Sequence, residues 1–207
     1  MYDLLKTWAE LQVGDRKTKK EFDTMMEEYE IHMKNNRYTL PSKIPEIIDT
    51  LRFGQKEKED LQILDLCCGT GLVGLELFNH GINNVDGVDF SDNINIAKER
   101  GYNEIYQHNL KELPSIKKYY DVVTMIGSLT YFNEYERDIL IKIKTFLNFK
   151  YLIVSHRSDM IDDKFMNLFH DKADLFRVVK IFQKLPYLPR SPHYKDITAS
   201  IFVLEKR

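Results

Sequence analysis

The sequence has few of the features that mark secreted, membrane-spanning or zinc-binding proteins. It has only two cysteines in 207 residues, and they are adjacent at Cys67 and Cys68, so they cannot join distant segments or supply an ordinary zinc site. No run approaches the ~20 consecutive apolar residues that a spanning helix needs, and the first residues lack the basic start and apolar stretch of a secretory signal. We therefore expect a cytoplasmic protein with no membrane contact and no metal site.

The sequence also lacks an excess of charge of either sign. It has 30 Lys and Arg against 32 Asp and Glu, a formal net charge of -2, which gives no broad electrostatic reason to expect nucleic acid. Internal repeats and low-complexity segments are not evident. A hydrophobic content of 43% and a length of 207 residues are typical of one globular domain, which we expect to span residues 1–207.

What the sequence does have is a glycine-rich stretch after a short apolar run. Residues 61–66 are too few for a helix and end at glycines, which indicates a buried strand, and from Leu72 the apolar spacing becomes helical. Gly69 and Gly71 have no Cβ, so they allow a tight turn and let backbone N–H groups approach a ligand at the helix N-terminus. The stretch predicts a nucleotide-binding turn.

The spacing of Gly69, Gly71 and Gly74 also fits the dinucleotide fingerprint of NAD-dependent oxidoreductases, so NAD stays an alternative ligand. Asp65, however, lies inside the otherwise apolar strand end, where its carboxylate would repel a diphosphate. A carboxylate there suits a ligand with a cationic end, such as the amino group of a methionine moiety.

From residue 61 onward, predicted strands and helices alternate, which is typical of a doubly wound parallel sheet. Near the end of the chain, two predicted strands follow each other directly and indicate an antiparallel hairpin. We expect a mostly parallel α/β sheet over residues 61–207 with helices on both faces, and a helical cover over residues 1–53 that includes Phe22, Met25 and Met26. The predicted strands are residues 61–66, 84–89, 104–107, 120–126, 151–155, 174–184 and 197–205, with helices at about 42–53, 134–146 and 159–170 among others.

The stretch from Leu64 to Gly71 resembles motif I of class I S-adenosylmethionine (SAM) dependent methyltransferases, whose pattern is apolar-Asp/Glu-x-Gly-x-Gly. Together with residues 87–91, 126–130 and 185–189, it is similar to the subgroup that includes the Williams-Beuren-region methyltransferase-like proteins. The resemblance covers about three-quarters of the chain. It implies a seven-stranded Rossmann-like sheet, SAM as methyl donor and S-adenosylhomocysteine as product.

Ligands of open α/β sheets bind outside the carboxyl ends of the strands, so the residues that close each strand are the candidates. Asp89 can accept hydrogen bonds from both ribose hydroxyls, whereas Asp86 is expected to be solvated and Ser91 or Asp92 to cap the next helix. Asn109 stands where the family usually has an Asp that meets the adenine amino group; the alternative is an ordinary turn residue. The cofactor-binding candidates are Tyr29, Tyr38, Asp65, Cys67, Gly69, Thr70, Gly71, Asp89, Phe90, Asn109, Leu110 and Ile126.

The acceptor end is expected after the fourth and fifth strands. Ser128 and Tyr131 are candidates for shaping its pocket, and His156 is the candidate general base, with a structural histidine as the alternative. Methyl transfer from a sulfonium needs an in-line nucleophile more than a base, so orientation and desolvation can supply most of the rate.

The sequence favours a SAM-dependent methyltransferase with a small-molecule acceptor over one that acts on a protein side chain. Amino-methylating DNA enzymes carry Asn/Asp-Pro-Pro-Tyr/Phe after the fourth strand, whereas this chain has Ile-Gly-Ser-Leu at residues 126–129. The chain also lacks the Pro-Cys pair that cytosine-C5 enzymes need. A non-catalytic SAM-binding or scaffolding relative and an NAD-dependent oxidoreductase remain the alternatives.

Overall fold

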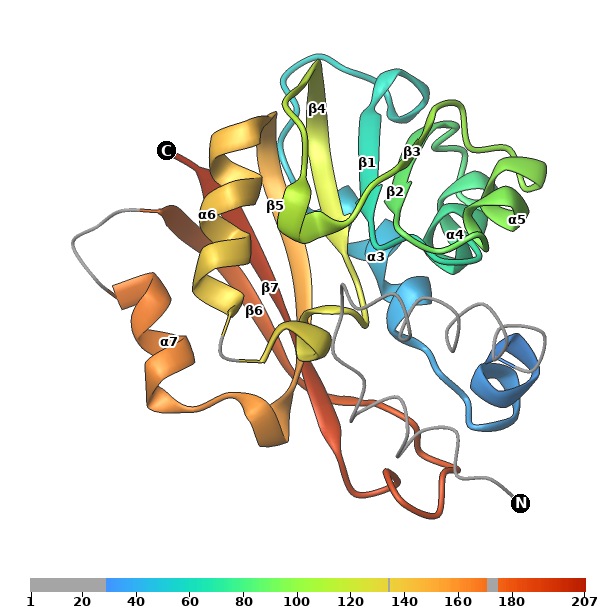
Figure 1. The fold of residues 1–207 in the computed structure, drawn as a ribbon, viewed down its shortest axis with the longest axis vertical. Coiled ribbons are helices and arrows are strands. Elements are labelled where there is room, and N and C mark those ends of the chain that lie inside the picture. The colour runs from blue at the N-terminus through green and yellow to red at the C-terminus, as the bar shows by residue number, and fades with distance from the viewer. Residues whose placement is uncertain (1–28, 134, 171–174) are drawn as a thin grey trace.

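A seven-stranded sheet forms the centre of the computed structural model, which describes residues 29–133, 135–170 and 175–207 (Figure 1). The strand order is β3-β2-β1-β4-β5-β7-β6, with β1 to β5 parallel and β7 antiparallel to both of its neighbours. The strands are β1 (Gln62–Leu66), β2 (Asn84–Asp89), β3 (Ile105–Gln107), β4 (Ile116–Met125), β5 (Leu147–Arg157), β6 (Phe176–Pro186) and β7 (Thr198–Lys206). The predicted mostly parallel sheet with a C-terminal antiparallel hairpin is confirmed.

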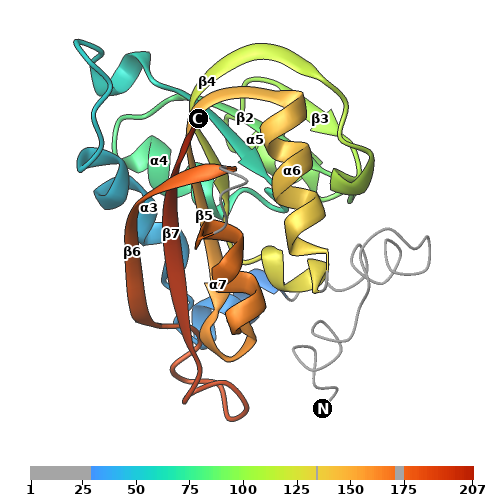
Figure 2. The same ribbon diagram turned by 90° about the vertical axis from the view of Figure 1, so that its left-hand side faces the viewer.

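Helices cover both faces of this sheet (Figure 2). On one face lie α3 (Leu40–Asp49), α4 (Leu72–Asn79) and α5 (Ile94–Glu99), and on the other α6 (Glu136–Phe146) and α7 (Asp163–His170). The single-turn 3-10 segments are η1 (Lys58–Asp60), η2 (Leu110–Glu112), η3 (Leu129–Phe132) and η4 (Ser158–Met160). Along β1, Ile63 packs into the core on the first face and Leu64 and Leu66 into the core on the second, so the central strand is buried on both sides.

The N-terminal cover is described only from residue 29, so Phe22, Met25 and Met26 lie outside the described residues. Residues 29–35 are helical. The next helix, α3, begins at Leu40, earlier than expected, because Pro41 occupies its first turn, where a missing N–H costs nothing. Pro45 lies inside this helix.

Some element boundaries differ from the prediction. Strands β4 and β5 begin earlier than expected, at Ile116 and Leu147. The helix after β5 begins later, at Asp163, because the Asp162 carboxylate accepts the Phe165 N–H at 2.7 Å and so sets its start. No helix in the described part of the chain is both long and apolar enough to cross a bilayer.

Two predictions about polar residues near β2 were wrong. Asp86 is fully buried rather than solvated, and its Oδ2 accepts hydrogen bonds from the Tyr120 hydroxyl at 2.7 Å and the Lys118 ammonium at 2.8 Å. Neither Ser91 nor Asp92 caps α5, whose N-cap residue is Asn93 without a side-chain cap bond. Ser91 instead donates both its N–H and its hydroxyl to Asp89.

The sheet order places the ligand site. The chain runs outward in one direction from β1 through β2 to β3, and in the other from β4 to β5, so the order reverses between β1 and β4. Loops leaving the carboxyl ends of these two strands diverge to opposite faces, which opens a crevice for ligands.

Candidate functional site

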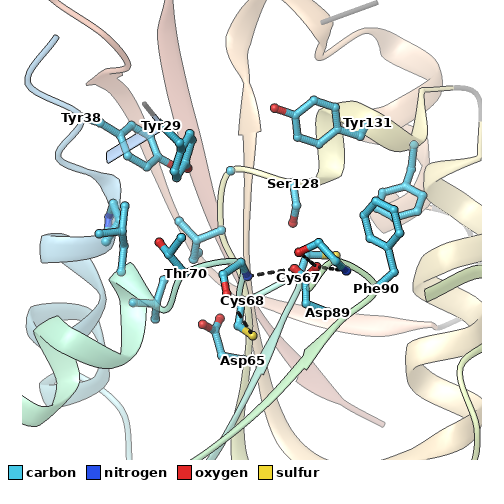
Figure 3. Close-up of a pocket in the computed structure, with 18 residues that line it drawn as sticks. Tyr29, Tyr38, Asp65, Cys67, Cys68, Thr70, Asp89, Phe90, Ser128 and Tyr131 are labelled. Carbon is cyan, nitrogen blue, oxygen red and sulfur yellow. Dashed lines mark hydrogen bonds between the residues drawn. The ribbon is translucent and has the colours of Figure 1, made fainter. Parts of the chain in front are cut away.

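A cavity lies at this edge of the sheet, between the glycine loop, the ends of β2 and β4, η3 and the N-terminal cover (Figure 3). Tyr29 and Tyr38 lie on one side of it and Tyr131 on the other, with Asp65 and Asp89 deeper in the site. The predicted site residues that line it are Tyr29, Tyr38, Asp65, Cys67, Gly69, Thr70, Asp89, Phe90, Ile126, Ser128 and Tyr131. The structure therefore brings together residues from segments more than a hundred positions apart in the chain.

Asp65 supplies a buried carboxyl group to the cavity. It is 1% exposed, and its two oxygens accept hydrogen bonds from different hydroxyls: Oδ1 from Thr124 at 2.7 Å and Oδ2 from Tyr102 at 2.7 Å. Burial raises the pKa of Asp65 to about 7, although both hydrogen bonds act in the opposite direction. The carboxyl group is thus poised between its neutral and charged forms near pH 7, and a nearby cation would favour the charged form.

Asp89 holds the glycine loop to the end of β2. Its Oδ2 accepts the Gly69 N–H at 2.8 Å, and its Oδ1 accepts the N–H and the hydroxyl of Ser91, both at 2.8 Å. Burial raises the pKa of Asp89, and the hydrogen bonds from Ser91 and Gly69 lower it in part. Each carboxylate oxygen has two acceptor positions, and both on Oδ1 are taken, so Asp89 Oδ2 keeps one position for a ligand in the cavity.

Two hydroxyl groups in the cavity wall are left for a ligand. Thr70 is 2% exposed and Ser128 7% exposed, and within residues 29–133, 135–170 and 175–207 neither side-chain oxygen has a hydrogen-bond partner. Buried hydroxyls without partners are costly, and a polar ligand in this cavity would relieve that cost. The cavity therefore fits a ligand that carries several hydrogen-bonding groups.

The outer rim of the cavity is formed by tyrosines from the cover and from η3. Burial raises the pKa of Tyr29, Tyr38 and Tyr131, so their hydroxyls are neutral at physiological pH. The Tyr38 hydroxyl comes so close to Gly127, whose φ is 79°, that a Cβ there would overlap it. Glycine at this position thus lets the cover close against the end of β4.

Four predicted site residues do not line the cavity. His156 is 1% exposed, its ring lies 4.8 Å from the Phe165 ring, and burial lowers its pKa to about 4, so it is neutral. Asn109 accepts the Lys111 N–H at 2.9 Å and so caps η2, which agrees with the alternative of an ordinary turn residue. The other two are Leu110, a core residue that is 3% exposed, and Gly71, the N-cap of α4.

Sequence reasoning missed three residues that support the site. They are Tyr102 and Thr124, which hold Asp65, and Arg100, whose guanidinium donates to the Thr70 carbonyl at 2.9 Å and pairs with Glu30 at 2.7 Å. Nothing local in the sequence marks Thr124 or Arg100. The role of Tyr102 becomes visible only in the structure, where three glycines leave room for its ring.

Comparisons with known proteins agree with this geometry. Residues 63–148 match a family model described as a methyltransferase domain. No curated protein matches the sequence significantly.

Solved structures share the fold at low sequence identity. Magnesium protoporphyrin IX methyltransferase from Synechocystis, with bound S-adenosylhomocysteine, is 15% identical with a TM-score of 0.64, covering 91% of this chain and 97% of its own. A TehB-like SAM-dependent methyltransferase from Corynebacterium glutamicum is 17% identical, with a TM-score of 0.62 and coverages of 87% and 97%. A possible histamine N-methyltransferase from Thermotoga maritima is 16% identical, with a TM-score of 0.62 and coverages of 90% and 98%.

The sheet order, the glycine loop with its two carboxylates and the family match over residues 63–148 lead to one conclusion. Residues 63–148 match a methyltransferase domain, and the sheet built on this segment has the fold of the SAM-dependent methyltransferases to which the chain is similar.

Proposed function

We propose that the protein transfers the methyl group of SAM to a small-molecule acceptor. The observation that carries the proposal is the buried Asp65 carboxyl group, whose ionisation a cationic ligand end would favour. In this proposal Asp65 faces the ammonium of the methionine moiety, and Asp89 Oδ2 accepts from a ribose hydroxyl. The unpaired hydroxyl of Thr70 and the side chain of Phe90 supply further contacts in the same cavity.

A small acceptor is favoured by the rim of the cavity and by the similar structures. The neutral tyrosines and Ser128 offer hydrogen bonds and apolar surface at the outer end of the cavity. Two of the similar structures are named for small acceptors, a magnesium porphyrin and, as a possibility, histamine. We extend that substrate class to this chain as part of the proposal.

The chemistry needs little from the protein beyond placement. A lone pair of the acceptor attacks the methyl carbon in line with the carbon–sulfur bond, that bond breaks, and S-adenosylhomocysteine leaves with the electron pair. A proton displaced from the acceptor passes to solvent. Because burial lowers the pKa of His156 to about 4, its imidazole is a weak base, and it also lies outside the cavity. We therefore assign catalysis to orientation and to exclusion of water, with Ser128 and Tyr131 orienting the acceptor.

Three further assignments belong to the same proposal. The first is membership of the Williams-Beuren-region methyltransferase-like subgroup, supported by the resemblance of residues 65–74, 87–91, 126–130 and 185–189. The second is a single domain over residues 1–207, and the third is a cytoplasmic location.

Calorimetric titration with SAM, S-adenosylhomocysteine and NAD tests the donor. We expect micromolar or tighter binding of the first two and none of NAD; NAD binding without a SAM response would favour an oxidoreductase instead. Incubation with methyl-labelled SAM and fractionated metabolites or proteins then tests for an acceptor. Label that enters no fraction above background, despite SAM binding, would favour a non-catalytic relative.

A further inference from the structure

Tyr102 lies directly beneath the glycine loop, although it belongs to the segment between α5 and β3. It is 3% exposed, and its ring packs edge-on against Phe78, with centroids 5.8 Å apart. Its hydroxyl accepts the Gly74 N–H at 2.9 Å and donates to Asp65 Oδ2 at 2.7 Å. One hydroxyl thus joins the first turn of α4 to the carboxyl group in the cavity.

Three glycines leave room for this ring. A Cβ at Gly71 or at Gly87 would come within 2.9 Å of ring carbons of Tyr102, and one at Gly74 would overlap the ring. These glycines lie in the loop, in β2 and in α4, so three separate elements lack a side chain where the Tyr102 ring packs. The requirement for glycine at position 74 therefore comes from Tyr102 and not from a left-handed backbone, which Gly74 does not have.

We propose that Tyr102 is a positioning residue for SAM binding, because its hydroxyl fixes the Asp65 carboxylate and the glycine loop in one arrangement. This inference rests on the proposed function, in which Asp65 meets the ammonium of SAM. Thr124 holds the other carboxylate oxygen but has no link to the loop, so it serves as a comparison.

Other titratable groups also face Asp65. They are Asp89 on β2, Cys67 and Cys68 on the glycine loop, and Tyr38 on the cover. Burial raises the pKa of both thiols and of Tyr38, so these three are neutral near pH 7. Asp89 is held by Gly69 and Ser91, without a bond from Tyr102.

The test compares Tyr102→Phe with Phe78→Leu. Tyr102→Phe keeps the ring among the glycines and removes only the hydroxyl, whereas Phe78→Leu loosens the packing of the ring and keeps the hydroxyl. SAM affinity is measured from pH 5.5 to 8.5, beside that of 5′-methylthioadenosine, which lacks the ammonium.

We expect Tyr102→Phe to move the midpoint of the pH profile for SAM upward by about one unit, the size of one lost hydrogen bond to a charged group. If the midpoint rises from about 7 by about one unit, the charged fraction of Asp65 at pH 7 falls about fivefold. SAM binding at pH 7 should weaken by the same factor, beyond any change for 5′-methylthioadenosine. Thr124→Val should move the midpoint similarly, and Phe78→Leu should leave it in place.

An unchanged midpoint in Tyr102→Phe, with equal losses for both ligands, would overturn the positioning role and reduce Tyr102 to packing. If the wild-type protein bound no SAM, the proposed function would fail separately. The pKa of Asp65, followed by carbon-13 NMR of its carboxyl group in wild type and Tyr102→Phe, would still decide the positioning role. An unchanged pKa there overturns it, and a raised one supports it.

Discussion

Replacing Asp65 by Asn should stabilise the unliganded protein while weakening its binding of SAM. Burial raises the pKa of this carboxyl group from 3.8 to about 7. Because the folded state then holds its proton more tightly than the unfolded state, ionisation costs nothing below pH 3.8, costs more as the pH rises, and reaches its full cost above pH 7. A difference of about 3 units corresponds to about 4 kcal/mol at pH 8.

Asn carries no charge to bury, and the hydroxyls of Tyr102 and Thr124 can each donate or accept a hydrogen bond. Asp65→Asn should therefore raise the melting temperature of the unliganded protein by several degrees at pH 8, and by less than half as much at pH 5. SAM affinity should fall by about 1.5 to 3 kcal/mol, the value of a charge-assisted hydrogen bond. Thermal denaturation at both pH values measures the change in melting temperature, and calorimetry with SAM measures the change in affinity.

The matched control is Asp86→Asn, which changes a buried carboxylate on the neighbouring strand. Asp86 is paired with the Lys118 ammonium at 2.8 Å, so this variant should lose stability and keep its SAM affinity. The reasoning about Asp65 would be refuted if Asp65→Asn lowered the melting temperature at pH 8 as Asp86→Asn does.

Three further predictions concern the same cavity. SAM affinity, measured by calorimetry, should fall about tenfold between pH 8 and pH 6 as Asp65 takes up a proton, while that of 5′-methylthioadenosine stays flat; parallel profiles would contradict the ammonium contact. Arg100→Gln and Glu30→Gln should each weaken SAM binding about two- to fivefold, as expected for a partly exposed ion pair, and should remove part of its salt dependence; a loss with only one variant would show that the pair is not the cause. Asp89→Ala should weaken SAM and adenosine alike, and a loss with SAM alone would contradict a ribose role.

The sequence predicted those parts of the fold that depend on local patterns. The strand at residues 84–89 was predicted with its exact bounds, and the buried strand before the glycine loop to within one residue. Asp65 and Asp89 were found because both stand at strand ends, and parallel strands bring these ends to one edge of the sheet.

The missed features depend on contacts between residues far apart in the chain. Asp65 is 37 positions from Tyr102 and 59 from Thr124, and no spacing rule connects them. Asp86 was predicted to be solvated because its Lys118 partner, 32 positions away, cannot be read from the strand in which it lies. Propensity and periodicity describe neighbours along the chain, whereas these side chains meet only after the strands are ordered.

The hydrogen bond from Gly69 to Asp89 has a consequence for discrimination among nucleotides. In a turn with left-handed residues, here Cys67 at φ 55°, Gly69 at 52° and Gly71 at 88°, free backbone N–H groups usually attract phosphate. In this loop the carboxylate of Asp89 already takes the Gly69 N–H, and Asp65 adds a second acid below. Adenosine compounds that carry phosphates would thus meet like charge at this position of the loop instead of a free Gly69 N–H.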